Sequence, residues 1–142
     1  MSANYADLLQ FYARQLRLLD DGHVEEWAGT FTVDGVLRQA HRTTARKGRA
    51  EIADGLRRAA DGLRARGAVR RHWVGNLTIE STGDTIHTRF YALVIESTPE
   101  NPAHLHLSTD IRDELVPVAD SWEIRERTII HDPDPVPPWL TT

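Results

Sequence analysis

His72 is the side chain in this sequence best suited to proton transfer. It lies in the segment Arg71-His72-Trp73-Val74-Gly75-Asn76, which reads as the start of a β-strand. Imidazole has an unperturbed pKa near neutrality, so a histidine on a cavity wall can accept or donate a proton at little energetic cost. A regular strand would place His72 and Asn76 on one face and Trp73 on the other. We therefore predict that His72 is a general base or acid, and the alternative is a hydrogen-bonded core histidine.

Asp20 is the candidate partner of this histidine. It ends the first predicted helix and follows Leu19, which lies on the apolar stripe of that helix. A carboxylate at this position would be partly desolvated and able to hold an imidazole or a water molecule in place. The alternative reading is an ordinary turn residue after a helix.

Two further polar patches are expected on later strands. The first alternates along one strand and contains His104, His106, Ser108 and Asp110. His-x-His followed by a carboxylate is also the start of a metal-binding pattern, with His131 as a possible additional ligand, but we predict no bound metal. The second patch alternates along the preceding strand and contains His87, Arg89 and Tyr91. We find no nucleophilic serine motif, phosphate-binding loop or dinucleotide fingerprint.

The periodicity of apolar residues predicts three helices followed by a sheet. The expected helices span residues 5–19, 23–31 and 49–66, and the expected strands span residues 36–41, 69–80, 85–96, 103–118 and 122–130. Charged residues from Asp113 to Arg127 are expected to form salt bridges between neighbouring strands. Helices that precede a long antiparallel sheet indicate an α+β fold in which the helices cover one face of the sheet.

Composition limits the class of protein. A chain of 142 residues is expected to form one domain, here residues 1–132, with a proline-rich C-terminal tail at residues 133–142. The sequence contains no cysteine, which favours a cytoplasmic location and excludes thiolate chemistry. A net charge of −4 argues against nucleic acid as a partner. The sequence has no apolar run long enough to span a membrane, so no membrane partner is expected.

Several segments of the chain resemble the SnoaL-like family of the nuclear transport factor 2-like superfamily. They are residues 12–27, 31–36, 48–52, 71–76, 113–116 and 121–127. This resemblance implies a cone-shaped, curved antiparallel sheet and three N-terminal helices that enclose a pocket.

Within this superfamily the sequence is similar to scytalone dehydratase. The pocket aspartate and one catalytic histidine of that enzyme correspond to Asp20 and His72, so the resemblance implies that both are catalytic, with Asp20 orienting His72. The tyrosine before the aspartate is replaced by Leu19, and the position of the second catalytic histidine falls near Ile95.

The tyrosine of the first strand in scytalone dehydratase falls near Ala40 or His41 here. The implied site is therefore partial, and His106 or Tyr91 is a candidate for the missing role.

The small SnoaL-like proteins that this chain resembles act in bacterial aromatic polyketide pathways. The resemblance implies a cofactor-independent enzyme, a dehydratase, a cyclase or a partner in hydroxylation, that forms a homodimer. The predicted substrate-binding residues are Tyr12, Trp27, Trp73, Asn76, Tyr91 and His106. The alternative is a non-catalytic ligand-binding or accessory subunit of an oxygenase-type complex.

Overall fold

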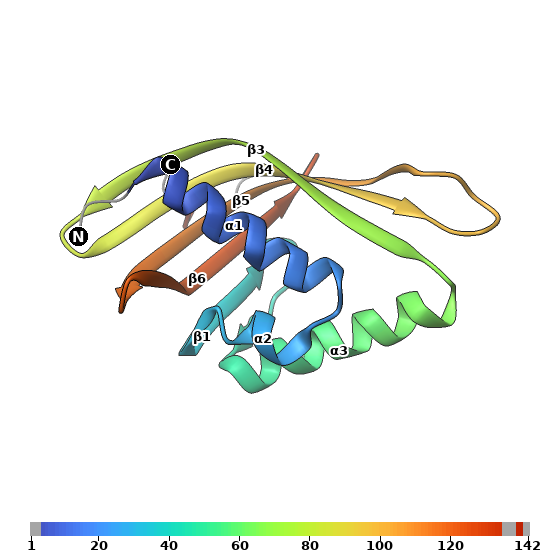
Figure 1. Ribbon diagram of the computed structural model, residues 1–142, viewed down its shortest axis with the longest axis horizontal. Helices are drawn as coiled ribbons and strands as arrows, with labels where there is room; N and C mark the ends of the chain where they lie inside the picture. The colour runs from blue at the N-terminus through green and yellow to red at the C-terminus, as the bar shows by residue number, and fades with distance from the viewer. Residues whose placement is uncertain (1–3, 135–138, 141–142) are drawn as a thin grey trace.

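The computed structural model describes residues 4–134 and 139–140 and contains three helices and one sheet (Figure 1). Most of the sheet follows the helices in the sequence. The helices are α1 (Tyr5–Asp20), α2 (Val24–Ala28) and α3 (Arg49–Ala65). The strands are β1 (Phe31–Gln39), β2 (Arg46–Lys47), β3 (Val69–Thr82), β4 (Thr85–Ser97), β5 (His104–Val118) and β6 (Ser121–His131).

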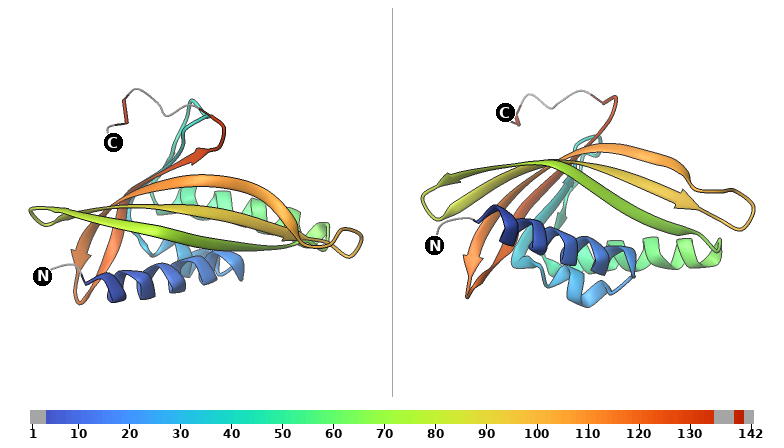
Figure 2. Two further views of the ribbon diagram at one scale, coloured as in Figure 1. Left: turned by 90° about the horizontal axis from the view of Figure 1, so that it is seen from above. Right: turned by 45° about the horizontal axis from the view of Figure 1, so that its top comes forward.

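The six strands form one open, curved sheet in the order β2-β1-β6-β5-β4-β3. Neighbouring strands are antiparallel except β1 and β6, which run parallel. The helices lie on one side of this sheet, as the right-hand view in Figure 2 shows. The predicted α+β fold with a curved sheet and N-terminal helices is confirmed, and the parallel β1–β6 pair is the exception to the expected antiparallel pairing.

Local interactions define both ends of helix α1. The Asn4 side chain accepts hydrogen bonds from the backbone N–H groups of Ala6 (2.9 Å) and Asp7 (3.3 Å), which caps the free N-terminal donors. After Asp20 the chain turns at Gly22, whose φ of 75° lies in the left-handed region that favours glycine. The buried face of the helix carries Leu8, Tyr12, Gln15 and Leu16. This end point places the Asp20 side chain over the sheet.

The predicted second helix and first strand required correction. The helix ends at Ala28, and Phe31 begins β1 instead of ending the helix. Gly29 and Thr30 form the turn between them, in which the Thr30 hydroxyl donates to the Trp27 carbonyl at 2.6 Å. The segment between the predicted first strand and the predicted third helix also contains the short strand β2, which pairs with β1.

A β-bulge interrupts β3 and corrects the predicted faces of that strand. Asn76 and Leu77 together lie opposite a single β4 residue, because Gly75 pairs with Tyr91 and Thr78 pairs with Arg89. Asn76 has a φ of 58°, in the left-handed region that asparagine tolerates better than most residues. Leu77 therefore points into the core, on the same side of the sheet as His72, and the predicted shared face of His72 and Asn76 is wrong.

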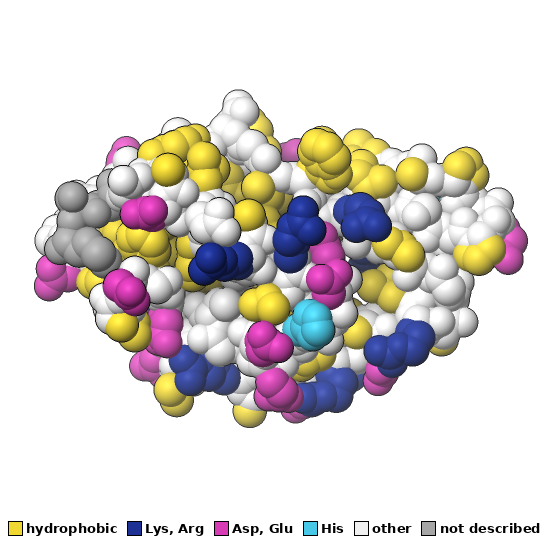
Figure 3. All heavy atoms as spheres, in the orientation of Figure 1, with side chains coloured by type: hydrophobic (Ala, Val, Ile, Leu, Met, Phe, Trp, Pro, Cys, Tyr) yellow, Lys and Arg dark blue, Asp and Glu magenta, His cyan; other side chains and the backbone are white. Residues whose placement is uncertain are grey.

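The core lies between the helices and the concave face of the sheet. Its fully buried members include Leu8, Phe31, Ile52, Leu115 and Ile124, each at 0% exposure. On the face shown in Figure 3, acidic and basic side chains are interspersed. The arginine-rich helix α3 contributes to this pattern, because Arg57 pairs with Glu25 of α2 and with Asp54. Its arginines are therefore largely engaged in ion pairs with neighbouring acids.

The predicted division into a domain and a tail remains a prediction. Residues 135–138 and 141–142 of the tail lie outside the described residues. Trp139 is described, and the guanidinium carbon of Arg38 lies 5.9 Å from the centroid of its ring. This contact places the tryptophan beside β1.

Candidate active site

A cavity of about 370 Å³ lies between α1, α3 and the concave face of the sheet. Most of its walls are apolar, and it also has polar and charged lining residues. These are Asp20, Gln39, Arg42, Arg46, Arg70, His72, Thr109, Arg127 and His131. Two other hollows, of about 240 and 340 Å³, are lined by other residues than Asp20 and His72. The 370 Å³ cavity is therefore the candidate active site.

Asp20 and His72 form a hydrogen-bonded pair in the wall of this cavity. The Asp20 Oδ1 atom lies 2.5 Å from His72 Nδ1, and Asp20 Oδ2 accepts the backbone N–H of the same histidine at 3.1 Å. The two side chains are only 14% and 19% exposed. An ionised carboxylate only accepts hydrogen bonds, so in the neutral imidazole the proton is on Nδ1 and the lone pair is on Nε2. This arrangement is suited to general base chemistry at Nε2.

Two elements position this pair. Asp20 is the last residue of α1, and His72 lies on β3 directly opposite Val94 of β4, which also lines the cavity. Tyr5, at the other end of α1, donates its hydroxyl to the Leu77 carbonyl of β3 at 3.2 Å. Helix α1 is thus fixed to β3 at both ends, and this fixes the distance between Asp20 and His72.

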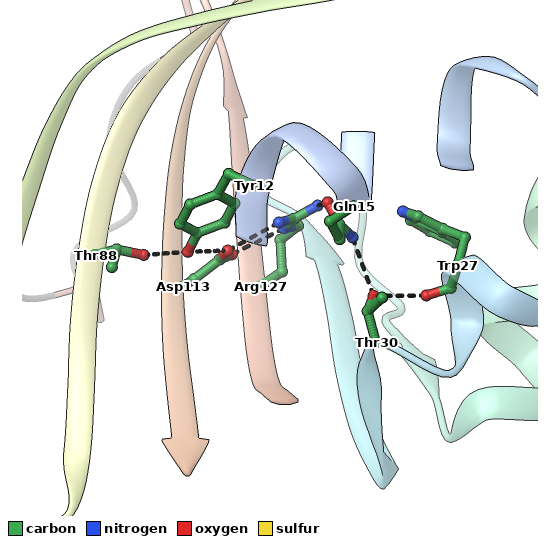
Figure 4. Close-up of polar contacts among 7 residues, drawn as sticks. All are labelled: Tyr12, Gln15, Trp27, Thr30, Thr88, Asp113 and Arg127. Atoms are coloured by element: carbon green, nitrogen blue, oxygen red, sulfur yellow. Dashed lines mark hydrogen bonds and ion pairs between the residues drawn. The ribbon is translucent and has the colours of Figure 1, made fainter. Parts of the chain in front are cut away.

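A buried polar network beneath α1 adjoins the cavity, which its member Arg127 lines (Figure 4). Arg127 and Asp113 make a bidentate ion pair with two contacts of 2.8 Å, and Arg127 also donates to Gln15 Oε1 at 3.3 Å. The Tyr12 hydroxyl donates to Asp113 at 2.8 Å and lies 2.5 Å from the Thr88 hydroxyl. The network joins α1 to three strands.

The charges in this network are strongly coupled. Burial raises the pKa of Tyr12 well above its ordinary value, and the nearby Asp113 carboxylate raises it further. Burial by itself would lower the pKa of Arg127, but the Asp113 carboxylate outweighs this effect and raises it. Tyr12 is therefore a neutral phenol and Arg127 a permanent cation, so neither is a proton acceptor in the neutral pH range.

A second charged cluster lies beyond His72 on β3 and β4. Glu96 accepts hydrogen bonds from Arg66 (3.0 Å) and Arg70 (2.8 Å), which lower its pKa to about 2. His106 Nδ1 lies 3.8 Å from the same carboxylate. His106 occupies a bulge in β5, because Val94 pairs with Leu107 while Ile95 pairs with Leu105. This bulge breaks the predicted alternation of the polar residues along β5.

The cavity rim carries two neighbouring histidines. The rings of His41 and His131 have centroids 4.6 Å apart. Burial lowers the pKa of His131, and the nearby His41 lowers it further. His131 is therefore uncharged near neutral pH.

The structure brings only part of the predicted substrate-binding set to the cavity. Trp27 lines it, and Tyr12 belongs to the adjoining buried network. Trp73 and Tyr91 lie on the opposite, convex face of the sheet, 68% and 52% exposed, because they alternate with the inward-pointing His72 and Ala92. The prediction that these two residues line the cavity is wrong.

Asn76 and His106 also lie outside the cavity lining. Asn76 is exposed in the β3 bulge, and His106 contacts Glu96 from the β5 bulge.

The expected interstrand salt bridges are confirmed by Asp113–Arg127 and Glu114–Arg125 across β5 and β6. His104 points toward the Pro102 carbonyl, 3.0 Å from its Nδ1 atom. The bulge thus separates His104 and His106 from Ser108 and Asp110.

Sequence reasoning missed the roles of Gln15 and Arg127 in the buried network. Gln15 is only 1% exposed and sits three residues after Tyr12 on the apolar stripe of α1. A polar residue on that stripe is a signal of a buried hydrogen-bonding partner. Arg127 gave a weaker signal, because a regular strand would place it on the same face as Arg125. The register shift in β6 between Ile124 and Glu126 separates the two arginines.

Comparison with known protein families gives one match that covers most of the chain. A family model described as a SnoaL-like domain matches residues 1–128. None of the curated proteins matches the chain. In the part of the chain that the structure describes, none of the helices is long and apolar enough to cross a membrane.

Three solved structures resemble the whole fold. Aln2 from a Streptomyces species is 32% identical with a TM-score of 0.82, and 90% of each chain is covered. ActVI-ORFA from Streptomyces coelicolor is 31% identical with a TM-score of 0.83, covering 92% of this chain and 96% of the other. A Catenulispora acidiphila protein, solved in complex with S-DNPA, is 33% identical with a TM-score of 0.80, covering 90% and 92%.

More distant structures share the fold alone. An NTF2-like protein with a cystatin-like fold from Novosphingobium aromaticivorans is 22% identical with a TM-score of 0.77, covering 90% of this chain and 81% of the other. The β subunit of benzoate 1,2-dioxygenase from Burkholderia mallei is 18% identical with a TM-score of 0.79, covering 93% of each chain. The sheet-and-helix architecture is thus shared well beyond close relatives.

Proposed function

Because the chain belongs to the SnoaL-like domain family, we propose that it is a cofactor-independent acid-base enzyme acting on an aromatic polyketide intermediate in bacterial secondary metabolism. The observation that supports this proposal is the Asp20–His72 pair, which lies in the wall of a largely apolar cavity. The reaction class that suits this pair is dehydration, with or without ring closure.

In this mechanism His72 moves the proton and Asp20 positions His72. The Nε2 atom takes a proton from a carbon next to a carbonyl group, and the electron pair of the broken C–H bond forms a C=C bond. The C–O bond to a neighbouring hydroxyl group then breaks, and Nε2 returns the proton so that water leaves. Asp20 stabilises the imidazolium through Nδ1–H, as the orienting carboxylate of other histidine dyads does. Positioned proton transfer of this kind contributes roughly 10²- to 10⁴-fold to the rate.

The cavity lining favours a largely apolar ligand with acceptor groups. Leu16, Leu37, Ile111 and other aliphatic side chains form most of the wall, and arginines supply hydrogen-bond donors at its margins. Aromatic polyketides combine flat apolar rings with carbonyl and hydroxyl groups, which suits such a lining. The relative from Catenulispora acidiphila provides a first candidate ligand, S-DNPA.

The proposal is tested by following turnover by mass spectrometry with S-DNPA and a panel of hydroxylated naphthalene and anthraquinone compounds. We expect wild-type protein to produce a product lighter by one water molecule, and His72→Gln to lose at least about 100-fold in rate while still binding the ligand. His87→Gln, on the convex face of β4, is the matched control and should retain full activity. Full activity in His72→Gln would contradict the proposal.

The convex face supports the predicted homodimer. Trp73, Tyr91 and Leu105 are large apolar side chains that remain 52–68% exposed on β3, β4 and β5. An apolar cluster of this kind marks an interaction surface, and a second copy of the chain is the partner we propose. Light scattering coupled to size exclusion should give a dimer for wild type and a monomer for Tyr91→Glu.

The second candidate function is an accessory, non-catalytic subunit of an oxygenase-type complex. The same exposed face favours it, because that face could bind a different chain. The two candidates are distinguished by the turnover experiment above. Tight ligand binding without any product, by wild-type protein alone, would favour the accessory role.

A further inference from the structure

We propose that His41, His131 and Asp134 form a binding site for a divalent transition-metal ion at the rim of the cavity. One possible ligand atom from each of the three residues lies within 4.8 Å of the other two. This group is distinct from the Asp20–His72 pair. It shares His131 with the metal-binding pattern considered in the sequence, but its other ligands are His41 and Asp134 instead of the histidines of β5.

The three residues are far apart in the sequence, and the fold brings them together. His41 follows β1, His131 is the last residue of β6, and Asp134 lies in the turn after β6. Strands β1 and β6 are parallel neighbours, so the ends of both strands reach the same edge of the sheet. The two imidazole rings meet there with centroids 4.6 Å apart.

Backbone hydrogen bonds hold the segments that carry these residues. The Ala40 N–H donates to the Ile129 carbonyl at 2.9 Å, which fixes the position of His41 relative to β6. The Asp134 N–H donates to the His131 carbonyl at 2.8 Å, and the Ser108 hydroxyl holds the Asp132 side chain at 2.8 Å. The backbone of the site is therefore held by the fold before any ion binds, and only the ligand side chains have to turn toward an ion.

The donor set selects a class of ion. Two imidazole nitrogens and one carboxylate oxygen suit Zn²⁺, Ni²⁺, Co²⁺ or Cu²⁺, whereas Mg²⁺ and Ca²⁺ prefer sites made of oxygen alone. Bonds to such ions are about 2.0–2.2 Å long, so the three ligand atoms must approach one another on binding. His41 and Asp134 are exposed and can turn to do so.

The position of the site gives the ion access to the ligand cavity. Three protein ligands leave at least one coordination position open. His131 lines the cavity, so an oxygen atom of a bound molecule can reach the open position of an ion held there. Arg42, which also lines the cavity, places a positive charge near His131 and opposes cation binding. We therefore expect a moderate affinity.

The test is isothermal titration of tag-free protein with Zn²⁺, with Mg²⁺ as the comparison ion. We expect one Zn²⁺ per chain in wild type and at least about tenfold weaker binding in His41→Ala and in Asp134→Asn, because each removes a ligand. His87→Ala is the matched control, since His87 lies on the convex face of β4, and its affinity should equal that of wild type.

Thermal unfolding provides an independent readout that requires no substrate. Zn²⁺ at a fixed concentration should raise the unfolding temperature of wild type and of His87→Ala equally, and should raise that of His41→Ala clearly less. Circular dichroism spectra that match wild type show that each variant is folded. The proposal is overturned if Zn²⁺ does not bind saturably, if Mg²⁺ binds as tightly, or if His41→Ala binds like wild type. These outcomes are independent of the proposed enzymatic function.

Discussion

The carboxylate of Asp20 contacts His72 at two points, and both are needed to fix the imidazole. One oxygen lies 2.5 Å from the ring nitrogen Nδ1, and the other accepts the backbone N–H at 3.1 Å. The backbone contact fixes the carboxylate relative to the main chain of β3, so the ring is held in one orientation. An asparagine has only one acceptor oxygen and cannot make both contacts.

We predict that Asp20→Asn lowers kcat by roughly 10²- to 10⁴-fold with little change in KM, because the imidazolium loses its partner while the cavity keeps its shape. Asp21→Asn is the control, since Asp21 is the next residue and is exposed. Steady-state kinetics on the substrate identified by mass spectrometry would give kcat and KM for both variants. Equal kcat for Asp20→Asn and wild type would show that this carboxylate has no part in the reaction.

Arg127 and Arg125 lie two residues apart on β6, yet we expect very different effects on stability. Arg127 is 2% exposed and pairs with the buried Asp113, so Arg127→Met should cost about 3–5 kcal/mol by leaving that carboxylate without its cation. Arg125 is largely exposed and pairs with Glu114, so Arg125→Met should cost less than about 1 kcal/mol. Urea unfolding gives both values, and similar costs would contradict the structural assignment.

At the scale of the elements, the β3 bulge determines which residues of this strand face the core. Asn76 and Leu77 together lie opposite one β4 residue. This extra residue reverses the alternation of inward and outward side chains beyond Gly75. Side-chain alternation up to Gly75 keeps His72 inward, and the bulge then turns Leu77 inward as well. A regular strand would expose Leu77 to solvent.

The bulge gives a prediction about Asn76. Its φ of 58° disfavours β-branched side chains, so Asn76→Val should lower the free energy of unfolding by about 1–2 kcal/mol. Asn76→Gly should remain within about 0.5 kcal/mol of wild type, because glycine adopts this conformation freely. Urea unfolding of both variants is the measurement. Equal stability of the valine and glycine variants would show that the strand is regular in solution.

Most helices and strands could be predicted from the sequence because each has a clear apolar period. Helix α1 has its apolar stripe, and the four long strands are separated by turns rich in glycine, proline, serine and aspartate. The end of α2 could not be predicted, because Phe31 fits the helical spacing of Val24 and Trp27 as well as it fits a strand. The two-residue strand β2 is too short to give any period.

The candidate site was predictable only in part. Asp20 and His72 are brought together as expected, because one ends a helix and the other begins a strand on the covered face. Trp73 and Tyr91 were misplaced, although simple alternation with His72 already puts Trp73 on the opposite face. The position of His106 depends on the β5 bulge, which has no local sequence signal.

At the scale of the whole molecule, Glu96 ties the end of α3 to the sheet. It lies on β4 and pairs with Arg66, just after α3, and with Arg70 on β3. Its side chain is only 7% exposed, and its partner Arg70 also lines the cavity. The same carboxylate makes the stability of the protein depend on pH.

We predict that the protein loses stability as the pH falls from 4.5 toward 2. The pKa of Glu96 is lowered from 4.5 to about 2 in the folded protein, so between these values the unfolded chain binds more protons than the folded chain. The contribution of these ion pairs is therefore complete above pH 4.5 and is lost toward pH 2. Urea unfolding across this range should show a smaller pH dependence in Glu96→Gln than in wild type.

The exposed Glu100, four residues further along the chain, provides the control for this measurement. Glu100→Gln should keep the full pH dependence of wild type. If both variants follow the wild-type curve, Glu96 does not stabilise the fold through its charge.

The bulge in β3 also affects how molecules meet one another. Strand β3 has 14 residues and forms an open end of the sheet order. A long, regular strand edge offers a row of free N–H and C=O groups to which a strand of another molecule can add. The extra residue at Asn76 breaks the regular spacing of these groups, and the neighbouring arginines 70 and 71 add charge. The irregularity that turns Leu77 into the core thus also protects the protein against edge-to-edge aggregation.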